Sequence, residues 1–304
     1  MPAPVLVVNA GSTSLKLSIV DGDTSEPVTS WGQTLGHVQA VGHRVVHGGD
    51  RFRDPVLIDN DVKRAISELA VIAPLHNEPA LRGIEEAEQA VPDVPHVAVF
   101  DTAFHATIPA EAATYAVPRE WREEWGVRRF GFHGLSVEWA ASQVRVPRLV
   151  VCHLGGGCSI TAVRDGLSID TTMGFTPLEG PPMATRSGTV DPGVLLYALR
   201  ERGLTHVELD RALEHQSGLE ALGGLDSELG FAVFTYRVAQ AVAAMATALG
   251  GLDALVFTAG IGENRADVRD AVTERVRFLG DFRAAVVPAR EDVVIARAVC
   301  ALLA

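Results

Sequence analysis

The chain has 304 residues, of which 47% are hydrophobic and 21% are charged, so it holds enough apolar material for a folded protein of two domains. Its net charge of −12 argues against a nucleic-acid-binding or membrane-surface protein, because those partners attract basic proteins. Its three cysteines are an odd and sparse set, which argues against a disulfide framework and favours a reducing compartment.

Residues 1–144 alternate short apolar runs with stretches of helical spacing. The chain opens with no basic region and no long apolar segment, which predicts a cytoplasmic protein rather than an exported one. Strands are predicted over residues 5–8, 15–20, 41–46 and 97–100. Helices are predicted over residues 61–73, 79–90 and 136–144.

Residues 149–303 continue this alternation. Strands are predicted over residues 149–154, 158–163 and 255–258. Helices are predicted over residues 191–201, 205–216, 229–249, 266–279 and 291–303. The longest apolar stretch contains Arg237 and Gln240, which predicts a buried helix rather than a membrane span. Because strands alternate with helices throughout, the predicted fold class is α/β, and hairpins near residues 10 and 155 suggest two related halves.

Three turns rich in small residues follow predicted strands. Residues 9–14, followed by Lys16, offer N–H groups, hydroxyls and a positive charge to a phosphate, with a plain polar hairpin turn as the alternative. Residues 155–157 are three glycines, which allow close approach to a phosphate or simply a tight turn. Residues 260–264 lie between a strand and a helix, a favourable place for an anion or a nucleotide. Together the three turns predict a phosphate-binding cleft, although none does so alone.

Two arginines lie in unusual settings. Arg44 closes an apolar strand, and Arg186 lies in a loop of small residues. An arginine can pair with a carboxylate or a phosphate through two hydrogen bonds. Both are therefore candidate substrate-binding residues, with a structural ion pair as the alternative for each.

Three further side chains are candidates for phosphoryl-transfer chemistry. His133 can stabilise a developing charge, with a buried structural histidine as the alternative. Asp101, which follows a predicted strand, and Glu291 are candidate ligands of Mg²⁺. Magnesium takes one or two protein carboxylates together with phosphate and water. Helix capping or a surface position is the alternative for either carboxylate.

Taken together, these segments resemble the acetate kinase family of the actin-like ATPase superfamily. The matching blocks are VLVVNAGSTSLK at 5–16, GHRVVHGG at 42–49, APLHN at 73–77, FDTAFHATIP at 100–109, VRRFGFHGLS at 127–136, VCHLGGGCS at 151–159, DTTMGFTPLEGPPMATRSGTVDP at 170–192, FTAGIGEN at 257–264 and EDVVIAR at 291–297. The blocks run in family order over nearly the whole chain, and the one at 170–192 is very specific.

The resemblance implies a fold, an assembly and a reaction. It implies two ribonuclease H-like (actin-like ATPase) domains with a central cleft, the N-terminal one formed by residues 1–101 plus 292–304 and the C-terminal, nucleotide-binding one by 102–291. It also implies a homodimer. The implied reaction is the reversible transfer of the γ-phosphoryl group of ATP to acetate or a similar short-chain carboxylate, giving an acyl phosphate and ADP. The implied metal is Mg²⁺, with Mn²⁺ as a substitute.

The resemblance also assigns roles to individual residues. The catalytic residues are Arg44, Asp101, His133 and Arg186. The substrate-binding residues are Arg44, Val46, Leu75, Phe132 and Pro177, the apolar members forming a small pocket for the acyl methyl group. Residues expected at the nucleotide and its phosphates are Asn9, Ser12, Ser14, Lys16, His153, Gly155, Gly156, Gly157, Gly260, Ile261, Gly262 and Asn264. Asn9 and Glu291 are expected at the metal, beside Asp101.

The sequence departs from the family pattern in three places. The chain is shorter than a usual member, with a reduced segment between residues 20 and 41. Gly156 stands where the family has asparagine, so one donor to the phosphates is lost. The family's serine, aspartate and arginine motif, which holds adenosine, should follow Ser217 and Gly218, but residues 219–229 resemble it only remotely.

These departures leave two alternatives open. One is a related acid kinase with a different phosphoryl donor, such as pyrophosphate, or with a different acid. The other is a non-catalytic binding relative, which predicts losses among the residues assigned to catalysis and metal binding. None of those residues is lost.

Overall fold

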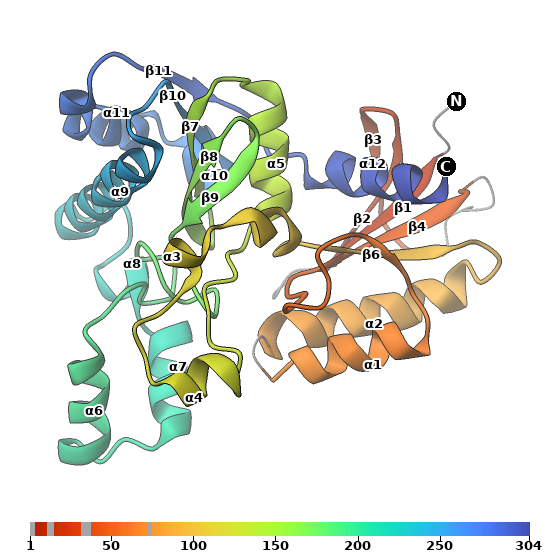
Figure 1. Cartoon of the computed structure of the whole chain (residues 1–304), viewed down its shortest axis with the longest axis horizontal. Coiled ribbons are helices and arrows are strands. Elements are labelled where there is room, and N and C mark those ends of the chain that lie inside the picture. Colours follow the sequence, from red (N-terminus) through yellow and green to blue (C-terminus); the bar gives the residue numbers. More distant parts are fainter. Residues whose placement is uncertain (1–3, 11–14, 32–37, 72–73) are drawn as a thin grey trace. The chain divides into compact units, whose positions relative to one another are not determined.

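The structure is a computed structural model that describes residues 4–10, 15–31, 38–71 and 74–304, without side-chain detail for residues 74–76. The chain divides into two compact units. Unit 1 comprises Met1–Ala106, Phe132–Trp139 and Arg290–Ala304, and unit 2 comprises Thr107–Gly131 and Ala140–Ala289. Each unit is built on one mixed sheet (Figure 1). The domain boundaries given above stay a prediction.

Unit 1 holds a six-stranded sheet in the order β3-β2-β1-β4-β6-β5. Its strands are β1 (Val5–Ala10), β2 (Leu15–Asp21), β3 (Thr24–Val28), β4 (Ala40–Val45), β5 (Val56–Leu57) and β6 (His96–Phe100). β1, β2 and β3 form an antiparallel meander, and β4 and β6 continue the sheet parallel to β1. The four strands predicted in this part of the chain are confirmed. β3 is not predicted, because it has too few apolar residues to show a strand pattern. It is an edge strand, where Pro27 is tolerated, and pairing with β2 rather than burial holds it in place.

Helices cover both faces of this sheet. They are α1 (Asn60–Leu69), α2 (Pro74–Ala90) and α12 (Glu291–Leu303). Leu6 and Val8 of β1 share a core cluster with Ala87 of α2. On the opposite side of the strands, a Cβ added to Gly42 would lie only 2.6 Å from Ile295 of α12. Successive strand residues face opposite sides, so the alternation along β1 and β4 places one helix layer on each face.

Two predicted helix boundaries in unit 1 are wrong. α1 ends at Leu69 rather than at residue 73. α2 begins at Pro74 rather than at residue 79, so Pro79 lies inside the helix. The first helical position suits a proline because its missing N–H would have no partner there. The sequence offers two prolines for that position, and Pro74 takes it.

Unit 2 holds a five-stranded sheet in the order β11-β10-β7-β8-β9. Its strands are β7 (Arg148–Leu154), β8 (Cys158–Arg164), β9 (Leu167–Thr171), β10 (Ala254–Thr258) and β11 (Arg283–Val286). β7, β8 and β9 form an antiparallel meander, and β10 and β11 continue the sheet parallel to β7. This is the same arrangement as β1, β2, β3, β4 and β6 of unit 1. Both predicted hairpins therefore open a sheet of the ribonuclease H type, and the α/β class is confirmed.

Short and long helices surround this second sheet. They are α3 (Ala110–Ala113), α4 (Arg119–Glu123), α5 (Gly134–Gln143, which begins in unit 1), α6 (Pro192–Glu201), α7 (His206–His215), α8 (Gly218–Ala221), α9 (Glu228–Leu249), α10 (Ala259–Asn264) and α11 (Ala266–Arg275). Two short 3₁₀ helices are η1 (Ala103–Thr107), which lies in unit 1 except for its last residue, and η2 (Arg277–Leu279) in unit 2. Within the described residues, α9 alone is long and apolar enough to cross a membrane by length and composition. It packs on β7, β8 and β9, as a core helix does.

Two further expectations are corrected in unit 2. Residues 260–264 form part of the short helix α10 rather than an open turn. The helix predicted over 266–279 breaks at Val276, between α11 and a 3₁₀ turn. Small residues favour turns by default, but here Oε1 of Glu263 accepts a hydrogen bond from the amide of Ala259 over 3.0 Å and so stabilises the first helical turn.

Candidate active site

The carboxyl ends of three parallel strands meet at one edge of the unit 1 sheet. Asn9 lies near the end of β1, Arg44 near the end of β4, and Asp101 directly after β6. Glu291, the first residue of α12, lies at the same edge. This edge of an open α/β sheet is where ligands usually bind.

These four residues form one connected polar cluster. Arg44 donates from Nε to Oδ2 of Asp101 over 3.1 Å, and its Nη2 donates to the same oxygen. Arg44 Nη1 donates to Oδ1 of Asn9 over 3.3 Å. Asn9 Nδ2 donates to Oε2 of Glu291 over 3.0 Å, and that oxygen lies 3.7 Å from Arg44 Nε. The fold thus joins residues that are as many as 282 positions apart in sequence.

Burial controls the charges in this cluster. The side chains of Arg44, Asp101 and Glu291 are 12%, 0% and 15% exposed. Burial lowers the pKa of Arg44, but the two carboxylates raise it by more, so the guanidinium stays charged. Burial raises the pKa of Asp101 to about 6, an effect that Glu291 increases and Arg44 opposes. The cluster therefore carries two acids and one permanent cation in a largely dry place.

The cluster fits a Mg²⁺ ion shared with a substrate rather than a self-contained metal centre. Asp101 Oδ1 is buried and makes no side-chain hydrogen bond with any described residue. Yet the part of the chain that the structure describes contains no group of three or more metal-ligating side chains. Two carboxylates at one edge match the way Mg²⁺ binds between protein and phosphate oxygens. Asp101, Glu291 and Asn9 are the residues that would hold it.

His133 and Phe132 occupy a strained segment of unit 1. His133 has a left-handed backbone with φ +60°, and Gly131 precedes Phe132 with φ +79°. Phe132 is buried, and its carbonyl oxygen lies 2.9 Å from Nε2 of His105. The ring of His47 meets that of Phe132 edge-on at 5.5 Å between centroids. Non-glycine residues with positive φ are uncommon, so the backbone at His133 is locally strained.

The apolar pocket residues are only partly described. Val46 is buried in unit 1 like Phe132, and Pro177 is buried in unit 2. The side chain of Leu75 lies outside the described residues. The role of all four at an acyl methyl group stays a prediction.

Arg186 in unit 2 is held by a partner that the sequence did not reveal. Its Nε lies 3.1 Å from Oε2 of Glu214 on α7, and its Nη1 donates to the carbonyl oxygen of Pro177 over 3.2 Å. Both charged side chains are nearly buried, at 13% and 14% exposure. α7 carries several acids, and only the packing of this helix beside the loop singles out Glu214.

The Arg186 loop is tied to the glycine turn between β7 and β8. The amide of Ala184 donates to the carbonyl oxygen of Gly156 over 3.3 Å. Within the turn, Gly155 N–H donates to Gly157 over 3.0 Å. A Cβ on Gly156 would meet no atom within 4 Å, so the lost asparagine of the family leaves open space here. His153, at the end of β7, is buried.

The third predicted turn adjoins the second. A Cβ on Gly155 would lie 3.4 Å from the Cβ of Ala259, which has φ +65° at the start of α10. Oε1 of Glu263 accepts hydrogen bonds from the amides of Ala259 and Ala289, over 3.0 and 2.9 Å. Asn264 Nδ2 donates to Gly260, and both residues are exposed. The glycine turn at residues 155–157 and the start of α10 thus lie side by side in unit 2.

The remaining predicted residues lie as follows. Lys16 is exposed on β2, opposite Asn9 in the hairpin register. Ile261 is half-buried and Gly262 is buried within α10. Ser12 and Ser14 lie outside the described residues.

The segment that replaces the family's adenosine motif, residues 218–227, makes contacts that stabilise the fold of unit 2. Gly218 has φ +64°, and a Cβ there would lie 2.3 Å from the carbonyl oxygen of Met183, so it supports the Arg186 loop. Ser227 caps α9 by accepting from the amide of Gly230 over 2.9 Å. Asp226 pairs with Arg265 over 2.9 Å at the surface. Gly218, Asp226 and Ser227 thus all take part in contacts within unit 2.

Comparisons with known proteins agree with the geometry. The model of the acetokinase family matches residues 28–291. An acetate kinase of Nostoc punctiforme is 46% identical over 287 residues, which cover 86% of this chain and 69% of that protein. A propionate kinase from Francisella tularensis has a similar structure, with a TM-score of 0.89, 32% identity and coverage of 97% and 98% of the two chains. An acetate kinase from Porphyromonas gingivalis gives 0.87 and 29%, with 99% and 100% covered. The chain spans about two thirds of the length of several curated relatives that it matches.

Proposed function

Because this chain belongs to the acetokinase family, we propose that it is a phosphotransferase that moves the γ-phosphoryl group of ATP to acetate or a similar short-chain carboxylate. The products are an acyl phosphate and ADP, and the reaction is reversible. The observation that carries the proposal is the buried cluster of Asn9, Arg44, Asp101 and Glu291. It supplies one fixed cation and two carboxylates at the edge of a sheet where ligands usually bind.

The chemistry requires positioning and charge neutralisation more than acid–base catalysis. A carboxylate substrate is already ionised near pH 7, since carboxyl groups have a pKa of about 4. No general base is then needed to activate it. Arg44 and Arg186 offer bidentate donors to carboxylate or phosphoryl oxygens, and His133 offers a further donor as charge develops.

We assign Mg²⁺ to Asn9, Asp101 and Glu291, and the nucleotide phosphates to the glycine-bearing segments of unit 2. When bound, Mg²⁺ neutralises charge on the phosphate oxygens. In the chain itself, Arg44 keeps Asp101 aligned, and Asn9 orients Glu291 through a 3.0 Å hydrogen bond. The amides of Gly156 and Gly157 lie in a turn and those of Gly260 and Ile261 lie at a helix start, positions that suit phosphate oxygens.

A second candidate function is the same transfer with another phosphoryl donor, such as pyrophosphate. The observation in its favour is that Ser227 caps a helix and Asp226 pairs with Arg265, so neither is available to hold a purine. The exposed Gly260 and Asn264 of α10 favour the nucleotide.

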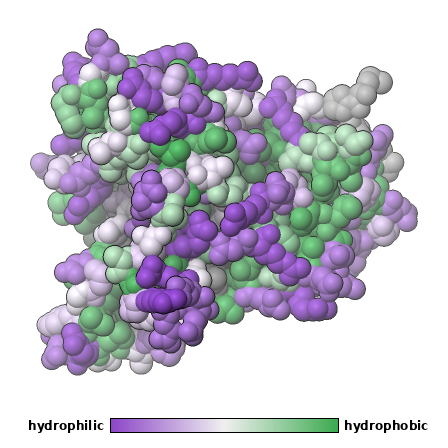
Figure 2. Space-filling model, in the orientation of Figure 1, coloured by the Kyte–Doolittle hydropathy of each residue, from purple (hydrophilic) through white to green (hydrophobic). Residues whose placement is uncertain are grey.

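We propose that the working form is a cytoplasmic homodimer. Neither α6 nor α7 has a buried residue. Val194, Leu196 and Tyr197 of α6 are 55%, 50% and 52% exposed. Figure 2 shows apolar surface in green among polar residues at the lower left, where Figure 1 places α6. A second copy of the chain would cover this helix.

The dimer is tested by light scattering after gel filtration. Leu196→Glu combined with Tyr197→Glu should yield a monomer that keeps its thermal unfolding transition. The control is Leu57→Glu, on an exposed edge strand of unit 1, which should leave the mass unchanged. A dimer that survives the double substitution contradicts the interface on α6.

The reaction is tested by trapping acyl phosphate with hydroxylamine, using acetate, Mg²⁺ and ATP. Arg186→Ala and His133→Ala should each lower the rate by at least about a hundredfold, as the loss of one donor to a transition state typically does. Arg64→Ala, an exposed arginine on α1, is the control and should keep full activity. Turnover with pyrophosphate but not ATP would select the second function. No turnover with any donor or short-chain acid would contradict both.

A further inference from the structure

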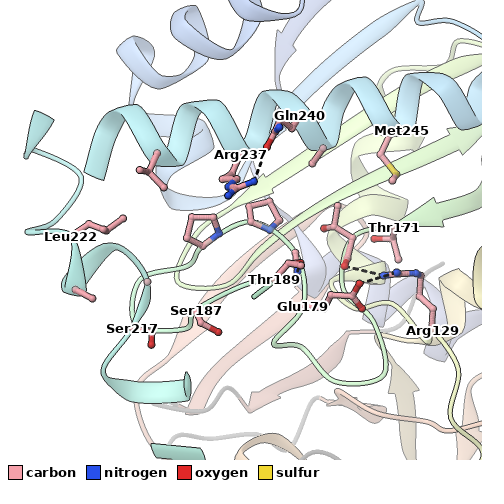
Figure 3. A pocket seen from close by; sticks show the side chains of 18 residues that line it. Arg129, Thr171, Glu179, Ser187, Thr189, Ser217, Leu222, Arg237, Gln240 and Met245 are labelled. Carbon is pink, nitrogen blue, oxygen red and sulfur yellow. Dashed lines mark hydrogen bonds and ion pairs between the residues drawn. The ribbon is translucent and has the colours of Figure 1, made fainter. Parts of the chain in front are cut away.

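Unit 2 contains a cavity whose lining includes none of the residues assigned above to the substrate, the nucleotide or the metal. Its volume is about 560 Å³, within the range of roughly 300–1,000 Å³ that is typical of ligand pockets. The cavity lies between α9 and the loop of residues 179–189 (Figure 3). Neither the glycine turn at 155–157 nor the α10 segment at 260–264 lines it. We call it the α9 pocket.

Apolar and polar side chains both line the α9 pocket. Pro181, Pro182, Leu222, Val233 and Met245 are apolar members of the lining. Hydroxyl and amide side chains lie among them, including Thr171, Ser187, Thr189 and Gln240 (Figure 3). Such a mixed lining suits a small organic molecule with an apolar body and a polar group.

The charges of the lining residues indicate which ligand charge the pocket favours. Two arginines and one glutamate are the charged residues in the lining, so the pocket carries a net charge of +1 in a chain of −12. Arg129 is neutralised by Glu179, 3.0 Å away. Arg237 on α9 donates instead to the neutral Oε1 of Gln240 over 3.0 Å. Arg237 is exposed, and within the described residues no carboxylate pairs with it, so its guanidinium is accessible to an anion that enters the pocket.

The wall of the pocket is the loop that carries Arg186. Gly180 and Thr189 close this loop, with Thr189 N–H donating to Gly180 over 2.8 Å and Gly180 N–H donating to the Thr189 hydroxyl over 3.1 Å. Pro182 and Ser187 line the pocket on either side of Arg186. The Arg129–Glu179 ion pair and the Tyr115 hydroxyl, which donates to Glu179, anchor the start of the loop. A molecule in the pocket would contact this loop at Pro182 and Ser187, close to Arg186 in sequence.

We propose that the α9 pocket is an effector site for a small organic anion with an apolar, ring-sized body. Arg237 and the Gln240 amide bind the anionic group, and the apolar side chains of the lining, Pro181 and Pro182 among them, contact the apolar body. Occupancy restrains the loop of residues 179–189 and so changes the rate at which Arg186 can serve the reaction. The effector does not react, and it is separate from the phosphoryl donor and the acceptor acid.

The test uses anilinonaphthalene sulfonate, a fluorescent organic anion with aromatic rings. Parent protein should bind it at one saturable site with a fluorescence gain. Arg237→Gln should weaken binding about tenfold, because one charge-assisted contact is lost. Ala241→Trp, which places an indole in the pocket, should abolish that site. Thermal unfolding checks that each variant is folded.

Matched controls separate this site from general apolar surface. Ala244→Trp makes the same change on an exposed position of α9 outside the pocket, and Arg64→Gln removes an exposed arginine of unit 1. Both should bind the probe like the parent. Equal affinity in the parent and in Ala241→Trp would overturn the proposal. So would equal losses in Ala241→Trp and Ala244→Trp.

A second readout concerns regulation. The probe should change kcat or KM for acyl phosphate formation at least about twofold in the parent, as even a modest shift of a loop equilibrium does. Arg237→Gln should show normal activity without the probe and no response to it. A probe that binds at the pocket but leaves kcat and KM unchanged contradicts the effector role. The fluorescence arm stays decisive for the pocket even if the proposed reaction is absent.

Discussion

Gly134 packs so closely on the backbone of Asp101 that a Cβ on Gly134 would lie 2.0 Å from the Asp101 carbonyl oxygen. The start of α5 is thereby held directly behind a buried carboxylate of the candidate active site. His133 comes immediately before it with its left-handed backbone. The same close approach therefore positions an acid and a histidine that are 32 residues apart in sequence.

Gly134→Ala should destabilise the protein and lower activity. The obstructing atom belongs to the backbone, so the start of α5 or the end of β6 must shift, at a cost of about 1–3 kcal/mol. Urea unfolding measures the loss. Gly156→Ala is the control, because a Cβ there meets nothing within 4 Å. If Gly134→Ala unfolds at the parent's urea midpoint, the close approach is not a constraint.

Buried histidines should make the protein less stable in mild acid. Burial lowers the pKa of His105 from 6.5 to about 4, although its contact with the Phe132 carbonyl opposes this, and burial also lowers the pKa of His43. Between pH 6.5 and 4 the unfolded chain binds a proton on His105 that the folded chain does not. The free energy of unfolding therefore falls as pH falls, by about 1.4 kcal/mol per pH unit for each such histidine.

The histidine effect is isolated by comparing variants, because Asp101 acts in the opposite direction. Its pKa is raised from 3.8 to about 6, so the folded chain binds a proton there that the unfolded chain lacks. His105→Gln keeps a donor for the Phe132 carbonyl and should flatten the pH dependence by the slope of one proton. The exposed His206→Gln should not change it. Identical slopes for His105→Gln and the parent would refute the assignment.

Glu214→Gln should weaken catalysis without unfolding the protein. Glutamine keeps the shape beside Arg186 but removes the charge that pairs with Nε at 3.1 Å. Arg186 then samples other positions, and kcat should fall roughly three- to tenfold. Glu220→Gln, on the neighbouring α8 and exposed, should keep the parent's kcat. An unchanged kcat in Glu214→Gln would mean that the pair has no positioning role.

Gly156→Asn should improve use of the phosphoryl donor. The position is exposed and free of obstruction, so an asparagine side chain fits and adds one donor toward the phosphates. One hydrogen bond is worth about 0.5–1.5 kcal/mol, which predicts a KM for the donor about three- to tenfold lower. Gly156→Ala is the control: it adds a side chain without an amide, so its KM for the donor should stay at the parent's value. A KM that rises in Gly156→Asn would show that the glycine is required there.

The local sequence pattern is enough to predict the strands and helices that bury apolar side chains. β1, β4 and β6 read as short β-branched runs, and α9 reads as one long apolar helix. The sequence pattern does not predict the edge strands β3, β5, β9 and β11, because pairing with a neighbouring strand, which periodicity does not record, holds them in place. Helix ends near Pro79 and Val276 were misplaced for a related reason, since capping depends on contacts beyond the local sequence.

The sequence by itself determined the fold class, the family and most candidate residues, because strand and helix periodicity and the spacing of glycines, arginines and acids are written along the chain. Only the tertiary structure decided which of these side chains act together. Arg44 reaches Asp101 and Glu291 because parallel strands bring their carboxyl ends to one edge, and Arg186 meets Glu214 because α7 packs beside its loop. The α9 pocket likewise has no signature in the sequence. A cavity is the space left between packed elements, and only their positions in three dimensions define it.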